Sequence, residues 1–326
     1  MNQVHILGGG PAGSSAALAA LSNGASVELI EKSQLPRHKV CGEFLSPEIQ
    51  QVLERIGVWD GFCEQRPARI ARMVLQFGTR NVSAKLPEPA YGLSRFRFDS
   101  LLFDAAVRRG AVWTKGSRSS GKPLIEATGR ITAAERGKRL FGFKAHFSGP
   151  IGDAVELFFF RDCYVGLNTV ENGITNVCGL GPERELKKFG FDIDALANSC
   201  PALRERISPL RREMKWLHVG PLVFRNGLGD SFEQGTYPCG DALSFVDPFT
   251  GSGLLSGVVM GELAGHFAAN GRPVDEYLAS CRKVLKKPFV ISTVFRSVAR
   301  HRWAGLLASA VPGDLLFRWT RPRSAA

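Results

Sequence analysis

The sequence predicts an α/β fold that combines a parallel sheet flanked by helices, an antiparallel sheet and a C-terminal helical segment. Three observations lead to this prediction. Residues 4–31 read as strand, glycine turn, helix and strand; residues 141–180 are rich in strands separated by tight turns; and residues 274–319 have a helical pattern. Strands that are joined through a helix pair in parallel, whereas strands that are joined by tight turns pair antiparallel.

The first half of the chain alternates strands and helices. Short apolar runs predict strands, and an alanine-rich stretch that Asn23-Gly24 ends predicts the first helix. Gly110 ends a later helix in the same way. In chain order, we expect a strand at 4–7, a helix at 14–22, a strand at 26–30, a helix at 47–56, a strand at 70–82, a helix at 98–109 and a strand at 124–127.

The second half begins with the strand-rich stretch, which turns at residues 148–150 and 171–173. A second strand that leads into a glycine turn and a helix follows much later, near residue 240. In chain order, we expect a helix at 183–206, a strand at 236–239, a helix at 253–270, and helical structure at 274–319 with a break at 312–313.

The composition is that of an ordinary globular protein. The chain has 326 residues, of which 44% are apolar and 22% charged, so it can bury a large core. Its seven cysteines are scattered without C-x-x-C spacing, and this pattern predicts neither a metal site nor a disulfide framework. Together with the lack of a recognisable secretory signal, this favours a cytoplasmic protein.

Basic residues exceed acidic ones, which gives a formal net charge of +12. A basic amphipathic stretch at residues 295–323 suits a membrane surface or an acidic carrier protein, so either is a candidate partner, with a peripheral location at the membrane. The alternative is a helix that caps the substrate domain. Nucleic acid is not an expected partner, because no recognition motif accompanies the charge. The arginines concerned are Arg296, Arg300, Arg302, Arg318, Arg321 and Arg323.

The N-terminal glycine turn has the spacing of a dinucleotide-binding motif. Gly8 permits a tight turn, Gly10 lets a diphosphate approach the backbone, and Gly13 lets the helix pack on the strand. The diphosphate then meets the free N–H groups of the helix N-terminus. Glu31, at the end of the next strand, is placed to accept hydrogen bonds from ribose hydroxyls. Pro11, Ala12 and Lys32 complete the expected contacts. This motif alone does not separate FAD from NAD.

A second motif resembles one of a known superfamily. Residues 240–242, 247–248 and 251–253 follow a strand and open a helix, as in the second FAD motif of the aromatic hydroxylase (p-hydroxybenzoate hydroxylase-like) and geranylgeranyl reductase superfamily. The resemblance implies FAD as cofactor, with the aspartate near the ribityl chain and the glycine turn at the isoalloxazine, where a helix N-terminus favours an anionic reduced ring. The implied contacts are Gly240, Asp241, Pro248, Gly251, Gly253 and Leu254.

Three further segments carry the same resemblance. Residues 37–43 are similar to the R-x-K-x-C-G segment that approaches the flavin, residues 94–99 to the R-x-x-F-D helix start, and residues 126–130 to the D-A-x-G-R segment. Arg97 is an alternative to Arg95, Cys41 is alternatively a small buried apolar residue, Glu43 alternatively a surface residue, and His38 is a further candidate. The implied FAD contacts are Arg37, Cys41, Gly42, Arg95, Ala127, Thr128 and Gly129.

The chain departs from this superfamily in two places. Residues 110–124 are too few for the three-stranded meander of relatives, so that edge of the domain is expected to be trimmed. The Y-x-W-x-F-P motif of prenyl reductases corresponds to Tyr164-Val165-Gly166-Leu167-Asn168-Thr169, in which glycine replaces tryptophan. This replacement argues against geranylgeranyl reduction and predicts a differently shaped cavity. The W-x-W-x-I-P motif of flavin-dependent halogenases does not occur, which argues against halogenation.

Together these observations predict a flavoprotein oxidoreductase with discontinuous domains. Residues 1–70, 94–135 and 234–272 form the FAD-binding domain, residues 71–93 and 136–233 the substrate-binding sheet, and residues 273–326 the helical segment.

We expect an FAD-dependent oxidoreductase or monooxygenase whose flavin is reduced by transiently bound NAD(P)H, because the sequence has no second Gly-x-Gly-x-x-Gly element that would hold that nucleotide permanently. The substrate would be a small, largely apolar phenolic, polyketide or isoprenoid compound, of the kind used in secondary metabolism. A prenyl double-bond reductase and a non-catalytic FAD-binding protein at a membrane or carrier are alternatives. The pocket would be lined by residues 74–77, 141–147 and 158–164, which could instead be sheet core. Cys41 and Glu43 are the candidate proton donors.

Overall fold

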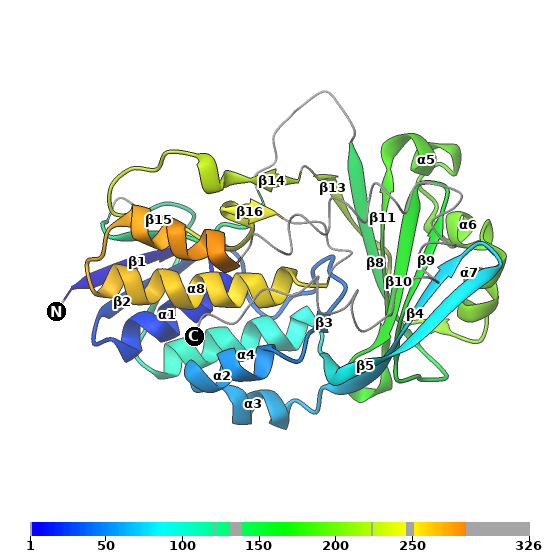
Figure 1. Cartoon of the computed structure of the whole chain (residues 1–326), viewed down its shortest axis with the longest axis horizontal. Coiled ribbons are helices and arrows are strands. Elements are labelled where there is room, and N and C mark those ends of the chain that lie inside the picture. Colours follow the sequence, from blue (N-terminus) through cyan, green and yellow to red (C-terminus); the bar gives the residue numbers. More distant parts are fainter. Residues whose placement is uncertain (1, 120, 131–138, 223, 246–250, 285–326) are drawn as a thin grey trace.

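The computed structural model describes residues 2–119, 121–130, 139–222, 224–245 and 251–284. These residues form two large sheets that lie side by side along the long axis of the molecule (Figure 1). One sheet is parallel and of Rossmann type, and the other is largely antiparallel. The predicted α/β fold class is therefore confirmed.

The parallel sheet has five strands in the order β15-β7-β1-β2-β6. Val4 and Ile6 of its central strand are fully buried, because a parallel sheet is covered on its faces. The strands are β1 (Gln3–Leu7), β2 (Ser26–Glu31), β6 (Val112–Lys115), β7 (Leu124–Glu126) and β15 (Thr236–Pro238).

The helices on this sheet pack closely because small residues face one another. A Cβ atom on Gly261 would lie 2.1 Å from the Ala12 carbonyl oxygen, and one on Gly265 would lie 2.2 Å from that of Ala16. Only glycine therefore allows the first and last of these helices to come into backbone contact. The helices are α1 (Pro11–Ser22), α2 (Ile49–Arg55), α3 (Trp59–Glu64), α4 (Arg95–Arg108) and α8 (Gly253–Ala269), and residues 274–284 are also helical.

The second sheet follows the order β12-β8-β11-β10-β9-β4-β5-β3, and β13 also pairs with β8. All pairs are antiparallel except β4 with β9. The strands are β3 (Phe44–Leu45), β4 (Ala68–Phe77), β5 (Arg80–Gly92), β8 (Leu140–Ser148), β9 (Ala154–Phe160), β10 (Cys163–Thr169), β11 (Thr175–Pro182), β12 (Arg211–Arg212) and β13 (Leu217–Leu222).

The two faces of this sheet differ because side chains alternate along each strand. On β8, Phe143 and Phe147 belong to an apolar core shared with the short helices α5 (Glu183–Lys188), α6 (Ile193–Asn198) and α7 (Pro201–Ile207). Alternation places Lys144 and His146 on the other face, toward the parallel sheet. The position of these two polar side chains determines the chemistry of the site described below.

Two of the predicted elements are divided in the structure. The helix expected at 183–206 is three short helices, because Gly190 adopts a left-handed φ of +59° and Pro201 begins a new helix. The strand expected at 70–82 is a hairpin of β4 and β5 that turns at Gly78, with φ +59°. By contrast, α4 begins earlier than expected, because the Ser94 hydroxyl accepts the Arg97 N–H at its N-terminus.

The remaining expectations concern the edges of the molecule. Between Gly110 and Leu124, the described residues contain the single short strand β6, with Val112 and Trp113 exposed. Residues 285–326 of the predicted helical segment lie outside the described residues. Within the described part of the chain, no helix combines the length and the apolar character needed to cross a bilayer.

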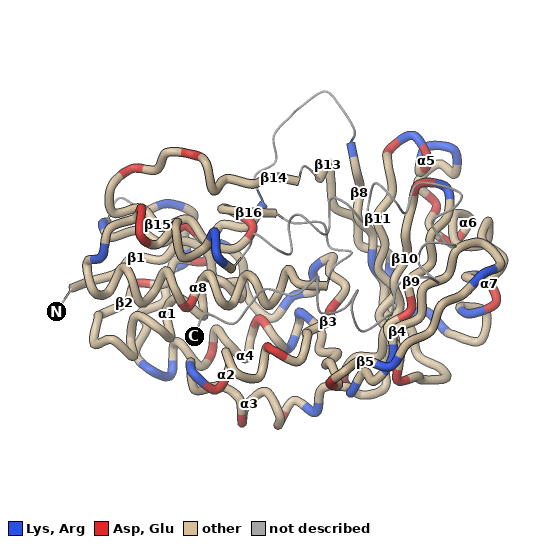
Figure 2. The backbone as a smooth tube through the Cα atoms, viewed as in Figure 1, with Lys and Arg blue, Asp and Glu red and all other residues tan. Residues whose placement is uncertain are grey.

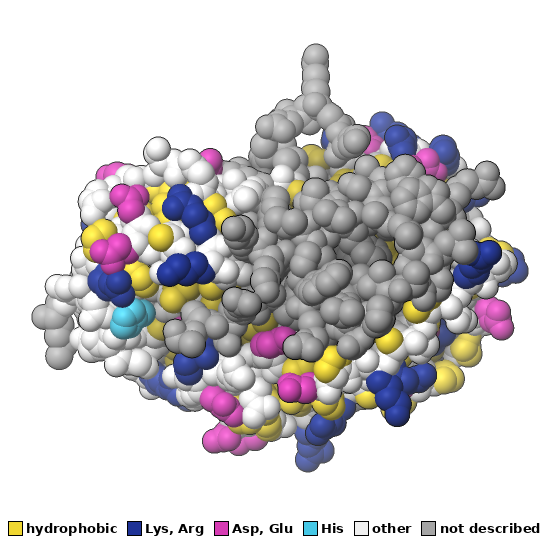
Figure 3. Space-filling model, in the orientation of Figure 1, with side chains coloured by type: hydrophobic (Ala, Val, Ile, Leu, Met, Phe, Trp, Pro, Cys, Tyr) yellow, Lys and Arg dark blue, Asp and Glu magenta, His cyan; other side chains and the backbone are white. Residues whose placement is uncertain are grey.

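Charged side chains are distributed over both sheets in the view of Figures 1 to 3. Figure 2 shows Lys and Arg on the strands and helices of both halves, and Figure 3 shows basic and acidic groups interspersed on the described part of this face. The arginine-rich stretch predicted as a partner surface falls outside the described residues.

Candidate functional site

A cavity of about 730 Å³ lies between the two sheets. Its walls come from the glycine turn after β1, the loop before β3, the start of α4, the end of β7, the start of α8, and the inner face of the antiparallel sheet. Nearly all of the predicted cofactor contacts line it. Those that do so are Gly8, Gly10, Pro11, Ala12, Glu31, Lys32, Arg37, Cys41, Gly42, Arg95, Ala127, Thr128, Gly129, Gly240, Asp241, Gly251, Gly253 and Leu254.

Two predicted contacts stand apart. Gly13 is not part of the cavity wall; it has a packing role, since a Cβ atom there would lie 1.8 Å from the Gly8 carbonyl oxygen. Gly8 is similarly constrained, with φ +112° and the Ala127 oxygen 2.2 Å from an added Cβ. Pro248 lies outside the described residues.

The glycine turn leaves open space at the N-terminus of α1. At Gly10, with φ −76°, an added Cβ would have only the Lys39 ammonium near it, at 3.7 Å. The Glu31 carboxylate steadies the turn by accepting hydrogen bonds from the N–H groups of Gly9 and Ser33, both at 2.8 Å. The buried Nε of Arg37 has no partner in the structure and belongs to the same cavity. An open helix N-terminus beside an unpaired guanidinium Nε, among the described residues, fits a diphosphate.

A buried carboxylate holds two cations beside this space. Asp99 is fully buried and accepts two hydrogen bonds from Arg95, at 2.5 and 2.9 Å, and one from Lys39 at 2.7 Å. Burial alone would raise the pKa of Asp99, but the two cations lower it on balance. Arg95 lines the cavity, whereas Arg97 points to Glu171 and does not. Lys39 was not among the predicted contacts.

The second glycine motif closes the cavity from the other side. Gly240 and Asp241 lie in the 3₁₀ turn η3 (Gly240–Ala242), and Gly251 and Gly253 lead into α8. Burial raises the pKa of Asp241, although Arg130, with its Nε 4.0 Å away, acts in the opposite direction. The N-termini of α1 and α8 therefore open onto one cavity, as a single FAD requires.

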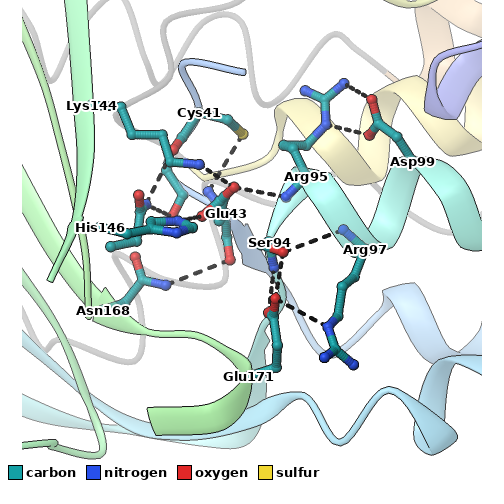
Figure 4. Close-up of polar contacts among 12 residues, drawn as sticks. Cys41, Glu43, Ser94, Arg95, Arg97, Asp99, Lys144, His146, Asn168 and Glu171 are labelled. Carbon is teal, nitrogen blue, oxygen red and sulfur yellow. Dashed lines mark hydrogen bonds and ion pairs between the residues drawn. The ribbon is translucent and has the colours of Figure 1, made fainter. Parts of the chain in front are cut away.

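Glu43 is the centre of a second polar network (Figure 4). Its side chain is fully buried, so the alternative of a surface residue is wrong. One carboxylate oxygen accepts a hydrogen bond from the Lys144 ammonium and another, at 2.7 Å, from the Arg95 backbone N–H. The other lies 2.7 Å from Nε2 of His146. Burial would raise the pKa of Glu43, but the hydrogen bond to His146 and the charge of Lys144 lower it on balance.

Two asparagines hold the backbone of this loop against the sheet. The Asn176 side chain donates to the carbonyl oxygens of Cys41 at 3.1 Å and Gly42 at 2.9 Å, and the Asn168 side chain donates to that of Glu43 at 3.5 Å. Glu43 itself has a left-handed φ of 53°, which this clamp supports. Neither asparagine was predicted as a site residue.

Lys144 and His146 were also missed, although the sequence contains a signal for them. In the stretch Phe143-Lys144-Ala145-His146-Phe147, apolar and polar residues alternate, which predicts that the polar pair shares one face of a strand. What faces that pair depends on the loop that carries Glu43, about one hundred residues earlier. The strand pattern alone could not supply this partner.

Most of the remaining sheet wall is apolar. Met73 and Leu75 of β4, Leu157 of β9, Tyr164 of β10 and Leu180 of β11 line the cavity. The predicted lining was correct only in part. Within the predicted ranges 74–77, 141–147 and 158–164, Leu75, Gly142 and Tyr164 line the cavity, whereas Phe143, Phe147 and Phe158 pack into the core on the opposite face.

Three neighbouring side chains carry atoms that could bind a metal ion. The ligand atoms of His38, Glu43 and His146 lie within 4.8 Å of one another. The Lys144 ammonium, however, donates to the same carboxylate, and a second cation there would be repelled. These side chains are therefore better described as a hydrogen-bond network.

Comparison with known proteins agrees with this geometry. The family described as FAD binding domain matches residues 1–135. Over 86% of its length the chain is 28% identical to digeranylgeranylglycerophospholipid reductase 1 of Methanothermobacter thermautotrophicus, of which 82% is covered. Over 134 residues it is 42% identical to the menaquinone reductase of Mycolicibacterium smegmatis. This aligned stretch covers 40% of this chain and 32% of that protein.

Solved structures share the fold at low sequence identity. A triple mutant of the flavin-dependent brominase Bmp2 superposes with a TM-score of 0.80 at 18% identity, covering 98% of this chain and 94% of the other. A geranylgeranyl bacteriochlorophyll reductase-like protein from Thermoplasma acidophilum gives a TM-score of 0.69 at 19% identity, covering 98% and 90%.

Proposed function

Because this chain is an FAD-dependent oxidoreductase of the superfamily that contains geranylgeranyl reductases and aromatic hydroxylases, we propose that it reduces an isoprenoid-type, largely apolar substrate. The observation that carries this proposal is the cavity itself. One wall of the cavity contains two helix N-termini. The other wall is the apolar face of the antiparallel sheet. A flavin bound there would supply hydride to a substrate on that face.

The residues that would hold FAD form two groups. The N-terminus of α1 at Gly10, together with Arg37 and Lys39, would bind the diphosphate. Asp241 and the N-terminus of α8 would bind the ribityl chain and the ring. This arrangement leaves the side chains of the antiparallel sheet to bind the substrate.

The substrate class follows from the wall that remains. Met73, Leu75, Leu157 and Leu180 offer an apolar surface with the Tyr164 ring beside them, which suits an extended hydrocarbon rather than a sugar or nucleotide. Gly166 also lines the cavity, at the position where prenyl reductases of the superfamily carry tryptophan, and Leu157 lies 3.0 Å from the place of an added Cβ. The two relatives named above are reductases of isoprenoid lipids by name. We propose that NAD(P)H, bound transiently, reduces the flavin.

The test is an anaerobic single turnover. Protein reduced with dithionite is mixed with a short-chain menaquinone or with geranylgeranylglyceryl phosphate, and flavin reoxidation and the mass of the product are followed. A product that gains two hydrogen atoms supports the proposal. Failure of both probes to reoxidise the flavin contradicts it, and so does substrate-coupled oxygen uptake with a hydroxylated product, which would indicate a monooxygenase.

A lipid substrate would have to reach the protein from a membrane or a carrier. We propose that the six arginines between residues 296 and 323 provide this contact with an anionic membrane surface. Sedimentation with vesicles that contain anionic lipid, with the full chain and with a variant in which these six residues are glutamine, tests the idea. Equal sedimentation of the two proteins would contradict it.

A further inference from the structure

The helix α4 begins at the junction of the two sheets, where two buried carboxylates bind its first turn (Figures 1 and 4). Glu171 lies on the 3₁₀ turn η1 (Glu171–Gly173), between β10 and β11. It accepts hydrogen bonds from the Ser94 N–H at 2.8 Å and from the Ser94 hydroxyl at 2.5 Å. Glu43 accepts the Arg95 N–H at 2.7 Å. A helix N-terminus leaves N–H groups free and attracts negative charge, so both carboxylates stabilise the start of this helix.

The same contacts fix the start of α4 to the antiparallel sheet. One carboxylate lies on a turn of that sheet, and the other, Glu43, is bound by Lys144 and His146 of β8. Just before the helix, the backbone also approaches the sheet closely, because a Cβ atom on Gly92 would lie 1.9 Å from the Thr169 carbonyl oxygen. The position of the helix start is therefore set by the sheet that forms the apolar wall of the cavity.

The first turn of α4 also carries groups of the proposed cofactor site. Arg95 lines the cavity and donates to Asp99 one turn later. Asp99 accepts a further hydrogen bond from Lys39, whose ammonium lies 3.7 Å from the place of a Cβ atom on Gly10. A displacement of the helix start would therefore move the cations beside the proposed diphosphate position.

We propose that Glu171 and Glu43 are positioning residues, which hold α4 so that a flavin in the cavity faces the apolar wall of the antiparallel sheet at the distance that hydride transfer requires. This inference rests on the proposed reductase function. That reaction adds a hydride from the reduced flavin and a proton from water to the substrate, which gains two hydrogen atoms while the flavin is left oxidised.

Neither carboxylate is placed to touch the substrate. Glu171 is 8% exposed and is not among the described residues that line the cavity. The side chain of Glu43 has no exposed surface, and both of its oxygens are already engaged by other groups. Their contribution therefore comes through the helix, and Glu171 is the better test because it lies outside the cavity wall.

Positioning differs from binding in what it changes. Hydride transfer needs the reacting atoms within about 3 to 3.5 Å, and a misplacement of about 1 Å can cost about 10²-fold in rate. Ferricyanide takes single electrons from a reduced flavin and needs no such alignment. A positioning residue should therefore alter the maximal rate of hydride transfer, while the affinity for FAD, the affinity for the substrate and the reaction with ferricyanide stay the same.

The variant Glu171→Ala removes both hydrogen bonds to Ser94. In Glu171→Gln the amide oxygen can still accept the Ser94 N–H and the amide nitrogen can donate to the hydroxyl, so this conservative variant should restore the function. Glu156→Ala is the matched control. Glu156 lies on β9, is paired with Arg206 at 2.7 Å, has a side chain that is 16% exposed, and is not among the described residues of the cavity wall.

A second, independent variant is Gly92→Ala, whose methyl group would push the segment before α4 away from the Thr169 carbonyl. This change removes no charge and no hydrogen-bonding side chain. If alignment of the helix start is what matters, Gly92→Ala and Glu171→Ala should shift the same quantity in the same direction.

Titration of each apoprotein with FAD gives the Kd. Dithionite-reduced holoprotein is then mixed anaerobically with increasing menadione, with a short-chain menaquinone or with ferricyanide, and flavin reoxidation is followed. We expect Glu171→Ala to lower the maximal rate with the quinones by about 10- to 10²-fold. The half-saturating menadione concentration, the Kd for FAD and the ferricyanide rate should stay unchanged. Glu171→Gln and Glu156→Ala should match the wild type in all four measurements.

The outcomes separate this inference from the proposed function. An unchanged maximal quinone rate in Glu171→Ala overturns the positioning role, as does an equal loss with ferricyanide. A loss of FAD binding together with the fold shows a purely structural role and also overturns it. A wild type that reduces menadione but no prenylated probe contradicts the proposed substrate class, and the menadione comparison still decides about positioning. A wild type that reacts with ferricyanide but with no quinone contradicts both proposals.

Discussion

Two fully buried carboxylates, Asp99 and Glu43, both contact Arg95, and each also has two side-chain partners: Arg95 and Lys39 at Asp99, and Lys144 and His146 at Glu43. Both have a pKa that burial would raise and that their partners lower on balance. Breaking such a pair leaves an uncompensated buried charge, which is costly. The two sites differ in their partners: Asp99 has an arginine and a lysine, whereas Glu43 has a lysine and a histidine.

The Asp99 site is built from an arginine and a lysine. Arg95 and Lys39 both donate to Asp99, and Arg95 has a raised pKa because the attraction of Asp99 outweighs burial. The Lys39 ammonium lies next to the open side of Gly10. Burial and the charge of Arg95 lower the pKa of Lys39, and Asp99 acts in the opposite direction. A lysine beside a helix N-terminus is suited to a diphosphate.

The Glu43 site contains a histidine in place of the arginine. The Lys144 ammonium donates to one oxygen of Glu43, and Nε2 of His146 lies beside the other oxygen. The loop from Cys41 to Glu43 is held to the sheet by Asn176. The site therefore holds the loop that carries Glu43 against the antiparallel sheet. Four changes test this division.

The largest effect is expected for Asp99→Asn. The amide leaves Arg95 and Lys39 without a counter-charge, and breaking a buried pair in this way costs about 3 to 5 kcal/mol in free energy of unfolding. Urea denaturation of the apoprotein measures the loss. Asp104→Asn, an exposed position on the same helix, is the control and should leave the midpoint almost unchanged. A small loss in Asp99→Asn would mean that the cluster is solvated in solution.

The next largest effect is expected for Gly10→Ala, which probes the space beside Lys39. The backbone at Gly10 suits alanine and the added methyl has room, so the melting temperature of the apoprotein should stay unchanged. The methyl would occupy the diphosphate position, and overpacking of about 1 to 3 kcal/mol corresponds to a roughly 5- to 150-fold weaker Kd for FAD. Titration of apoprotein with FAD measures the change.

The contrast is Gly13→Ala, three residues further on, where the methyl would meet the Gly8 carbonyl. That variant should lose stability without FAD, because α1 can no longer pack on the turn. Equal effects of the two substitutions on the apoprotein would contradict the assignment of Gly10 to the diphosphate.

The glycine turn at Gly10 was largely predictable from sequence, whereas the networks around Asp99 and Glu43 were not. Gly8, Gly10, Gly13 and Glu31 act within one strand–helix–strand unit, so their spacing alone encodes the geometry. Glu43 was predicted only through resemblance, and its partners on β8 lie about one hundred residues away. Such contacts depend on how two sheets dock, which local patterns do not record.

The same distinction explains why the predicted lining of the pocket was correct only in part. The ranges 141–147 and 158–164 were correctly assigned to strands, but each strand has two apolar or mixed faces. Phe143 and Phe158 are larger and more apolar than Gly142 and Tyr164, yet they face the short helices. Without the positions of α5–α7, hydrophobicity alone could not identify which face borders the cavity.

A smaller effect is expected from the pH dependence of Glu43→Gln. The folded-state pKa of Glu43 lies below its ordinary value, so the unfolded chain binds more protons as pH falls. The ionised carboxylate therefore stabilises the protein above its ordinary pKa of about 4.3, and this contribution is lost as pH falls through the folded-state pKa. Urea denaturation from pH 7 to pH 3 should show the cost of Glu43→Gln shrinking on acidification.

Asp99, Asp153 and Glu213, whose pKa values are also lowered, should keep some pH dependence in that variant. A cost of Glu43→Gln that stays constant with pH would mean that the carboxylate is not ionised in the native protein.

The smallest effect is expected for an ion pair at the surface, whose hydrogen-bond geometry is as good as that of the buried Asp99 pair. Arg55 of α2 donates to both carboxylate oxygens of Glu262 on α8, at 2.7 and 2.8 Å, but its side chain is 38% exposed. Water already solvates both groups, so the double-mutant cycle of Arg55→Ala and Glu262→Ala should give a coupling below about 1 kcal/mol. Raising the salt concentration should reduce this coupling further, while the loss in Asp99→Asn changes little. A coupling as large as the Asp99→Asn loss would show that bidentate geometry, rather than burial, determines the strength of these ion pairs.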